Sequence, residues 1–240
     1  MCLPLFILHL FSAIAAAASA LGRFTCMFNN AGVGAACDTL GEALSKWQVL
    51  RRMIDINVNA CCLGTYLALE AFKRDGTSRG SVVTTASMAG LLPVGAPPIY
   101  SMTKAANIQF TRSTAAQLGG DASDIRVYAL CPSYTATGLG PDPEVIKAAL
   151  GGVLLPSHMA EGFMLLCEGD LPNGSVMRVT ARRRGTRVVH DLVTYGKELG
   201  GAATPRPGIV IKEAVLEEYH GPARKAKDSF GNEMLSRGKL

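Results

Sequence analysis

The sequence predicts an α/β protein, a doubly wound parallel sheet with helices on both faces. Short apolar segments rich in β-branched residues alternate with longer helical patterns, which is typical of βαβ units. The segment 81–86, Ser-Val-Val-Thr-Thr-Ala, has the composition of a strand buried on both faces. The chain has 240 residues, 48% hydrophobic and 18% charged, so we expect one globular domain with a tail.

The order of the expected elements follows the same alternation. Strands are expected at residues 24–28, 81–86, 126–130 and 175–180. Helices are expected at residues 12–21, 53–73, 99–118, 143–150 and 158–167. From residue 204 onward, prolines mix with charges of both signs, so we expect the segment 204–240 to be a disordered tail.

Cysteine and charge patterns predict neither a metal site nor a nucleic-acid partner. Seven cysteines stand at positions 2, 26, 37, 61, 62, 131 and 167, without a C-x-x-C pair, so reduced thiols are expected rather than metal ligands or disulfides. The net charge of +5 comes partly from the arginines at 182–184 and 187. No aromatic residue is interleaved with these arginines, which favours a solvated strand end or loop over a nucleic-acid surface.

A candidate catalytic pair stands on the expected helix 99–118. Tyr100 and Lys104 are four residues apart, so both side chains lie on one helix face, one turn apart. A fixed ammonium can lower the pKa of a tyrosine by roughly 1 to 3 units, toward neutrality. Ser87 follows the strand 81–86, and the carboxyl end of a parallel strand faces the ligand crevice. Taken alone, the Tyr-x-x-x-Lys spacing also fits a helix surface pair.

Several motifs occur in a fixed order around this pair. Asn-Asn-Ala-Gly stands at 29–32 and Asp-Ile-Asn-Val at 55–58; Ser87, Tyr100 and Lys104 follow, and then Arg-Val-Tyr-Ala-Leu-Cys-Pro at 126–132. Over residues 12–181 this series resembles the short-chain dehydrogenase/reductase family from its fourth strand onward. The stretches 63–69 and 173–180 are most similar to its 15-hydroxyprostaglandin dehydrogenase branch.

The resemblance implies a role for each catalytic residue. Tyr100 would be the general acid/base for the substrate oxygen while hydride moves to or from a nicotinamide. Lys104 would lower the pKa of Tyr100 and hydrogen-bond the nicotinamide ribose, so both residues would contact the cofactor. Ser87 would donate to the substrate oxygen. Asn57 would hold a water in the proton relay. Without the other motifs, the asparagine of Asp-Ile-Asn would be interpreted as a helix-interior residue whose side chain bonds to the backbone.

The same resemblance implies further contacts to the cofactor, NAD or NADP, with NAD favoured. Asn30, Ala31 and Gly32 would approach its adenosine and ribose side, where glycine permits close backbone approach. Without the other motifs, this segment would be read as a turn. Pro132 and Thr137 match the family's Pro-Gly-x-x-x-Thr segment beside the nicotinamide.

The sequence departs from the family pattern at three places. Ser133 stands where the family has glycine, so a side chain would crowd the nicotinamide. Pro97 stands where the prostaglandin branch has glutamine, so the identity of the substrate cannot be inferred from that branch. The glycine-rich turn T-G-x-x-x-G-x-G, which would bind the pyrophosphate, does not occur, and Gly32 and Gly34 cannot replace it. The first strands of the doubly wound sheet are therefore expected to be missing, which would leave the strand 24–28 at an edge.

Three interpretations of residues 1–20 remain open. The apolar stretch with Ala-Ser-Ala at 18–20 fits a secretory signal without a basic leader, and it is a marginal transmembrane candidate. The preferred interpretation is a family helix from residue 12, preceded by a leader or remnant at 1–11. This divides the chain into 1–11, a truncated family domain at 12–203, and the tail at 204–240. A cytoplasmic protein is then expected, or a secretory or membrane-associated one if residues 1–20 act as a signal or anchor.

Two functions follow. The first is a nicotinamide-dependent oxidoreductase of a small secondary alcohol or ketone, with a lipid-like substrate as one expectation. The second is a silent relative that acts through subunit association, or a truncated fragment. The two helices around Asn57 and Tyr100 would form the family's subunit interface, so a homodimer or pairing with a related subunit is expected. For this polypeptide as written, we expect weak or absent activity.

Overall fold

The computed structural model describes residues 12–17, 19–20, 22–34, 45–93, 98–139, 142–144, 146, 152–181 and 188–193. By its internal contacts the chain divides into residues 1–203 and 204–240, and the description below concerns the first unit. The expected leader, the expected tail, Pro97 and the arginine cluster at 182–187 lie outside the described residues.

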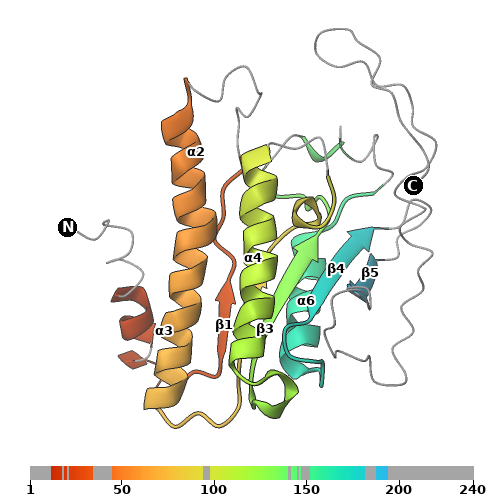
Figure 1. The fold of residues 1–240 in the computed structure, drawn as a ribbon. Helices are drawn as coiled ribbons and strands as arrows, with labels where there is room; N and C mark the ends of the chain where they lie inside the picture. The colour runs from red at the N-terminus through yellow and green to blue at the C-terminus, as the bar shows by residue number, and fades with distance from the viewer. Residues whose placement is uncertain are drawn as a thin grey trace, which may run out of the picture. The chain divides into compact units, whose positions relative to one another are not determined.

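Five strands form one sheet in the order β1-β2-β3-β4-β5 (Figure 1). The first four run parallel, and the last is antiparallel to its neighbour. Their bounds are Cys26–Asn29 for β1, Gly80–Thr85 for β2, Ile125–Pro132 for β3, Val176–Ala181 for β4 and Val188–Leu192 for β5. The α/β fold class and the four parallel strands are thereby confirmed, whereas β5 was not predicted.

Helices cover both faces of the sheet (Figure 1). Residues 12–17 and 19–20 are helical, and the described residues 143, 144 and 146 of the expected helix 143–150 are helical as well. The longer helices are α2 at Trp47–Ile54, α3 at Ala60–Arg74, α4 at Pro98–Gln117 and α6 at Pro156–Glu168. Two short 3-10 turns are η2 at Met88–Gly90 and η3 at Gly120–Ala122.

The strands are apolar throughout because each face packs against helices. Val82 of β2 packs with α3 and α4, and the next residue, Val83, packs on the opposite face with Leu166 of α6. Side chains alternate between faces along a strand, so a strand covered on both sides needs apolar residues in succession. This two-sided burial explains why the sequence of β2 predicted its position well.

A π-helical turn interrupts the long helix predicted at 53–73. Helix α2 runs into the turn η1 (Asp55–Asn59), which continues directly into α3, so the helical path extends from Trp47 to Arg74. A π turn inserts an extra residue and is often found at functional sites. Asn57 lies within this turn and is buried.

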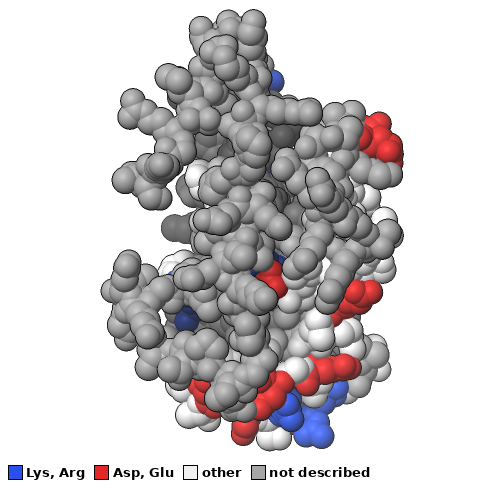
Figure 2. Space-filling model, turned by 90° about the vertical axis from the view of Figure 1, so that its right-hand side faces the viewer, with Lys and Arg blue, Asp and Glu red and all other residues white. Residues whose placement is uncertain are grey.

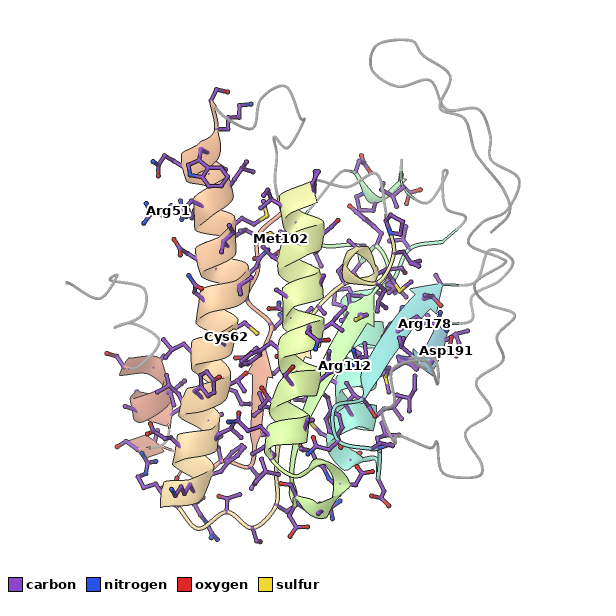
Figure 3. All side chains as sticks on the ribbon, in the orientation of Figure 1. Arg51, Cys62, Met102, Arg112, Arg178 and Asp191 are labelled. Atoms are coloured by element: carbon purple, nitrogen blue, oxygen red, sulfur yellow. The ribbon has the colours of Figure 1, made fainter. Side chains whose placement is uncertain are left out.

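Strand β1 lies at the end of the sheet. Among the described strands it pairs only with β2, in agreement with the edge position expected for residues 24–28. All four of its residues are half-buried. At the other end, an ion pair between Arg178 of β4 and Asp191 of β5 joins the antiparallel strands at 3.5 Å (Figure 3).

The described surface mixes charges of both signs. Acidic and basic side chains lie close together at the lower end of the face in Figure 2. Some oppositely charged side chains form ion pairs, such as Arg126 with Asp121 at 3.3 Å. Within the described residues, no helix combines the length and apolar character needed to cross a membrane.

Candidate active site

The predicted catalytic residues meet at one edge of the sheet. The turn at 30–34 follows β1, Ser87 follows β2, and α4 carries Tyr100 and Lys104. Parallel strands present their carboxyl ends at the same edge, so the segments that follow β1 and β2 are brought together there. Helix α4 packs against the turn η2, which directly follows Ser87.

Lys104 is buried at the centre of this cluster. Its side chain is 3% exposed, and Nζ donates a hydrogen bond of 2.8 Å to the carbonyl oxygen of Thr85, the last residue of β2. Burial lowers the pKa of Lys104 to about 8, an effect opposed by the nearby thiols of Cys61 and Cys131. An ammonium that donates to one carbonyl, as Lys104 does among the described residues, has two further N–H groups for a ligand.

Tyr100 is half-buried, and its pKa departs from the expectation. Burial raises the pKa of Tyr100, while a hydrogen bond with Ser87 opposes the rise. The sequence argument expected the Lys104 ammonium to lower this pKa. That expectation is wrong, since Nζ lies 5.7 Å from the centre of the Tyr100 ring and donates to Thr85. The desolvation of the phenol therefore decides the direction of the shift.

Ser87 is held by its own turn beside Tyr100. It has extended backbone angles, and its Oγ accepts a hydrogen bond of 3.1 Å from the Ala89 amide as the N-cap of η2. The pairing of the Ser87 and Tyr100 hydroxyls gives two polar groups that a substrate oxygen could contact together.

Asn57 joins two parts of the site. It is 1% exposed, its Oδ1 accepts from the Val33 amide at 2.8 Å, and its Nδ2 donates to the Val33 carbonyl at 3.0 Å. The same Nδ2 donates to Thr103 Oγ1 at 3.2 Å, and Thr103 is on α4 beside Lys104. The side chain thus ties the turn after β1 to the catalytic helix. Its role in a water relay stays a prediction.

Replacing Asn57 with alanine should destabilise the fold by about 1–3 kcal/mol, because it leaves the Val33 amide and carbonyl without their partner. Urea unfolding measures this difference. Asn59→Ala is the matched control in the same π turn, because Asn59 is exposed and bonds only Asp55 among the described contacts. That control should stay within about 0.5 kcal/mol of wild type. Equal losses in the two variants would contradict the bridging role of Asn57.

The buried ammonium of Lys104 should make stability depend on pH. The folded pKa is about 8, whereas an unfolded lysine titrates near 10.4. Between these values the unfolded chain binds more protons at this position, so the free energy of unfolding rises with pH. Relative to Lys104→Met, the wild type should gain up to about 1 kcal/mol per pH unit between pH 8 and 10.

Urea unfolding of both chains at several pH values in this window measures the gain. Lys73→Met, at an exposed lysine of α3, is the matched substitution. If Lys73→Met and Lys104→Met follow the same pH dependence, burial of Lys104 is not the cause.

The predicted cofactor-binding residues divide into two groups. Gly32 lies inside the cluster: a Cβ built on it would be 3.5 Å from both Asn57 Oδ1 and Lys104 Nζ. Asn30 and Ala31 are exposed at the same edge, and Asn30 Oδ1 accepts from Thr85 Oγ1 at 2.9 Å.

On the other side, Pro132 ends β3, and the next residue, Ser133, donates its amide to the Val179 carbonyl at 2.8 Å. Thr137 is exposed, and its described hydrogen bond is local, from the Leu139 amide.

Sequence reasoning missed the residues that support the cluster. Thr85 supplies the carbonyl for Lys104, and Thr103 accepts from Asn57 and donates to the Tyr100 carbonyl at 2.7 Å. Asn29 donates to Thr65 Oγ1 at 3.0 Å, which attaches the end of β1 to α3. Threonines occur in many strands and helices, so their local sequence gave no signal of these roles.

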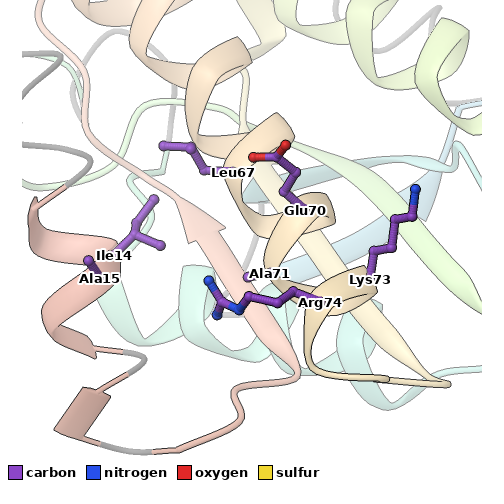
Figure 4. A pocket seen from close by; sticks show the side chains of 7 residues that line it. All are labelled: Ile14, Ala15, Leu67, Glu70, Ala71, Lys73 and Arg74. Carbon is purple, nitrogen blue, oxygen red and sulfur yellow. The ribbon is translucent and has the colours of Figure 1, made fainter.

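A separate pocket of about 620 Å³ lies between the helical residues 12–17 and α3 (Figure 4). Its lining is Ile14, Ala15, Leu67, Glu70, Ala71, Lys73 and Arg74. None of these was predicted as a site residue, and none belongs to the Tyr100 cluster. The pocket is therefore distinct from the candidate active site.

Known proteins share both the sequence pattern and the fold. Residues 9–143 match the family model described as short chain dehydrogenase. The 15-hydroxyprostaglandin dehydrogenase [NAD(+)] of Mus musculus is 32% identical over an alignment of 178 residues, and the match covers 68% of this chain and 62% of the relative. The mitochondrial borneol dehydrogenase of Lavandula x intermedia is 30% identical over 165 residues, covering 66% of this chain and 61% of that protein. The chain thus spans about three fifths of the length of these relatives.

Solved structures agree with this result. The 3-ketoacyl-(acyl-carrier-protein) reductase from Brucella melitensis, complexed with NADH, matches with a TM-score of 0.65 and 26% identity, covering 74% of each chain. ElxO with NADP bound matches with a TM-score of 0.62 and 21% identity over 72% of each chain, which supports the fold alone. From the family model, together with the motifs and the sheet described above, we conclude that the chain belongs to the short-chain dehydrogenase family.

Proposed function

We propose that this chain is an oxidoreductase that transfers hydride between a nicotinamide cofactor and a secondary alcohol or ketone. The observation that carries the proposal is the meeting of Ser87, Tyr100 and the buried Lys104 at the carboxyl edge of the parallel strands. Paired hydroxyls beside a buried amine suit proton exchange with an alcohol or carbonyl oxygen. The family membership supports the same class of reaction.

The described residues fit the nicotinamide end of such a cofactor. Gly32 leaves room beside Lys104 Nζ. Among the described residues Nζ donates one hydrogen bond, to the Thr85 carbonyl, so its other N–H groups can donate to ribose hydroxyls. Among the described residues, no glycine-rich turn precedes β1 to hold a pyrophosphate. When bound, the cofactor would supply or accept the hydride. We favour NAD over NADP, because the similar prostaglandin dehydrogenases are named for NAD(+).

The protein's own part would be proton transfer and orientation. Tyr100 would give its phenolic proton to the substrate carbonyl oxygen, or take one from the alcohol, while Ser87 donates to the same oxygen. Because burial raises the pKa of Tyr100, the phenol carries its proton at neutral pH, which is the form that can donate to a carbonyl oxygen. Lys104, anchored to Thr85, would fix the ribose, and Asn57 would keep the turn at 31–34 against the catalytic helix.

The substrate class is drawn from the relatives. The prostaglandin and borneol dehydrogenases are named for lipid-like or terpenoid alcohols, which supports a small apolar secondary alcohol as the substrate.

We also place the protein in the cytoplasm, because the described cysteines are free thiols, as expected in a reducing compartment.

A dimer through the long helices completes the proposal. Helices α2, α3 and α4 expose large apolar side chains, namely Trp47, Val49, Tyr66 and Met102, each 46% to 54% accessible. Met102 lies on α4 at the height of α2 in Figure 3. Exposed apolar side chains on these helices favour association with a second copy or a related subunit.

A silent relative is the second candidate. It is favoured by the missing pyrophosphate turn in the described residues and by Ser133 in place of glycine. A protein named inactive 2-(S)-hydroxypropyl-CoM dehydrogenase 2, from Xanthobacter autotrophicus, is 29% identical over 183 residues. On this hypothesis the chain acts through its helices.

Titrating the purified chain with NADH and with NADPH separates the two candidates. We expect saturable nicotinamide fluorescence changes together with a rise in the thermal midpoint, stronger for NADH. Gly32→Val should abolish both changes, because its side chain would fill the space beside Lys104 Nζ. Gly138→Ala, with open space around its Cβ, is the control. If the folded wild-type chain binds neither nucleotide, the oxidoreductase proposal fails and the silent relative is favoured.

A further inference from the structure

Two cysteines far apart in the sequence meet between the edge strand and helix α6. The Sγ atoms of Cys26 on β1 and Cys167 on α6 lie 2.9 Å apart, although 141 positions separate the residues. Both side chains are half-buried and both are free thiols. The sequence had predicted reduced thiols here and gave no sign that these two would touch.

The thiol contact is accompanied by a second side-chain contact between β1 and α6. Residues two apart on a strand share a face, and residues four apart on a helix share a face. Cys26 and Phe28 follow the first rule, and Phe163 and Cys167 follow the second. The Phe28 and Phe163 rings pack with centroids 4.4 Å apart, next to the thiol pair. The register of β1 on α6 is thus fixed by a second contact, which keeps the two sulfur atoms together.

The pKa values of the two thiols shift in opposite directions. The hydrogen bond with Cys167 lowers the pKa of Cys26, whereas the same contact and burial raise the pKa of Cys167. Cys26 is therefore the thiol of the pair that ionises more readily, and Cys167 the one that keeps its proton. Other described thiols have a raised pKa: burial raises that of Cys62 to about 11 and that of Cys131 to about 12. Oxidants react with thiolates, so they should select Cys26.

We propose that Cys26 and Cys167 form a reversible disulfide that clamps β1 onto α6 when the chain meets a peroxide. The Cys26 thiolate attacks one peroxide oxygen and, after proton uptake, becomes a sulfenic acid as one water leaves. The Cys167 thiol then attacks the Cys26 sulfur, the S–O bond breaks, and a second water leaves. Two thiols lose two electrons, hydrogen peroxide gains them, and a dithiol reductant reverses the change.

Little movement is needed to close this bond. A disulfide has a sulfur separation near 2.05 Å, so the two Sγ atoms need to approach by about 0.9 Å from their separation of 2.9 Å. The clamp would hold the strand that leads into the turn at 30–34. The proposal depends on no step of the oxidoreductase function, because it concerns thiols outside the Tyr100 cluster.

The test is peptide mapping of the full chain after treatment with hydrogen peroxide. Free thiols are alkylated before tryptic digestion under non-reducing conditions. We expect the peptide 24–46, which holds Cys26 and Cys37, to be linked to the peptide 148–178, which holds Cys167. Cys37→Ser should keep this link, and Cys26→Ser and Cys167→Ser should each lose it. Dithiothreitol should remove it from the wild-type chain.

Thermal unfolding of the oxidised chain tests the clamp itself. A cross-link between distant positions restricts the unfolded chain, so the midpoint should rise by roughly 5 °C or more and return on reduction. Alkylation of both Cys26 and Cys167 in the peroxide-treated, folded wild type would overturn the proposal, as would a link that uses Cys37. A Cys26–Cys167 link without any rise in the midpoint would overturn the clamp.

Discussion

Replacing Tyr100 with phenylalanine is expected to lower the rate of secondary-alcohol oxidation by roughly 10²- to 10⁴-fold, whatever rate the wild-type chain supports. The substitution removes the hydroxyl that meets Ser87 and keeps the ring beside Lys104. Nucleotide binding should persist, because Lys104 and Gly32 are unchanged. Steady-state kinetics with a panel of secondary alcohols, alongside nucleotide titration of the same preparations, measures both effects.

Tyr128→Phe is the matched control for this experiment. Tyr128 is a buried tyrosine on β3, and its hydroxyl donates to the Leu171 carbonyl at 3.2 Å. Its side chain packs with Leu166 of α6, on the face of the sheet opposite α4. Losing its hydroxyl should cost about 1 kcal/mol of stability without a comparable loss of rate. If Tyr100→Phe retains the wild-type rate, Tyr100 is not the acid/base.

Gly90→Ala should destabilise the fold by about 1–3 kcal/mol and separate Ser87 from Tyr100. A Cβ at Gly90 would be 2.6 Å from the Lys104 carbonyl carbon and 2.7 Å from the Ala105 amide nitrogen. Both are backbone atoms of α4, so they cannot move aside as a flexible side chain would. The turn η2 would be pushed away from α4, and with it Ser87, which precedes the turn.

Thermal unfolding of Gly90→Ala against Gly138→Ala gives the measurement. Nothing lies within 4 Å of a Cβ built on Gly138, so the control introduces the same methyl group without an overlap. The midpoint of Gly90→Ala should fall by several degrees below that of the control. Indistinguishable midpoints for the two variants would show that η2 is not closely packed on α4.

The strands that the sequence predicted are those with helices on both faces. The run 81–86 could be recognised because two-sided burial demands apolar residues in succession, and β2 was found at Gly80–Thr85. Strand β5 was missed because its sequence, Val-Val-His-Asp-Leu, includes two polar residues and all five positions are half-buried. Its position comes from pairing with β4, including the contact of Arg178 with Asp191.

The catalytic helix shows the same division. The four-residue spacing of Tyr100 and Lys104 was enough to predict that they share a helix face. The direction of the Tyr100 pKa shift was not predictable, because it depends on burial and on where Nζ donates. The π turn at Asp55–Asn59 was also not predictable, although it directs Asn57 toward Val33 and Thr103.

The sequence by itself determined the parallel sheet, because buried strands need successive apolar residues. It also determined the family and the catalytic candidates, because its ordered motifs resemble those of the family. Only the tertiary structure decided which groups are desolvated and which distant atoms touch. Two contacts were decided in this way: the hydrogen bond from Lys104 to the Thr85 carbonyl, and the contact between the thiols of Cys26 and Cys167. Long-range contacts depend on how strands and helices pack across the sheet, and no single segment of the sequence contains that information.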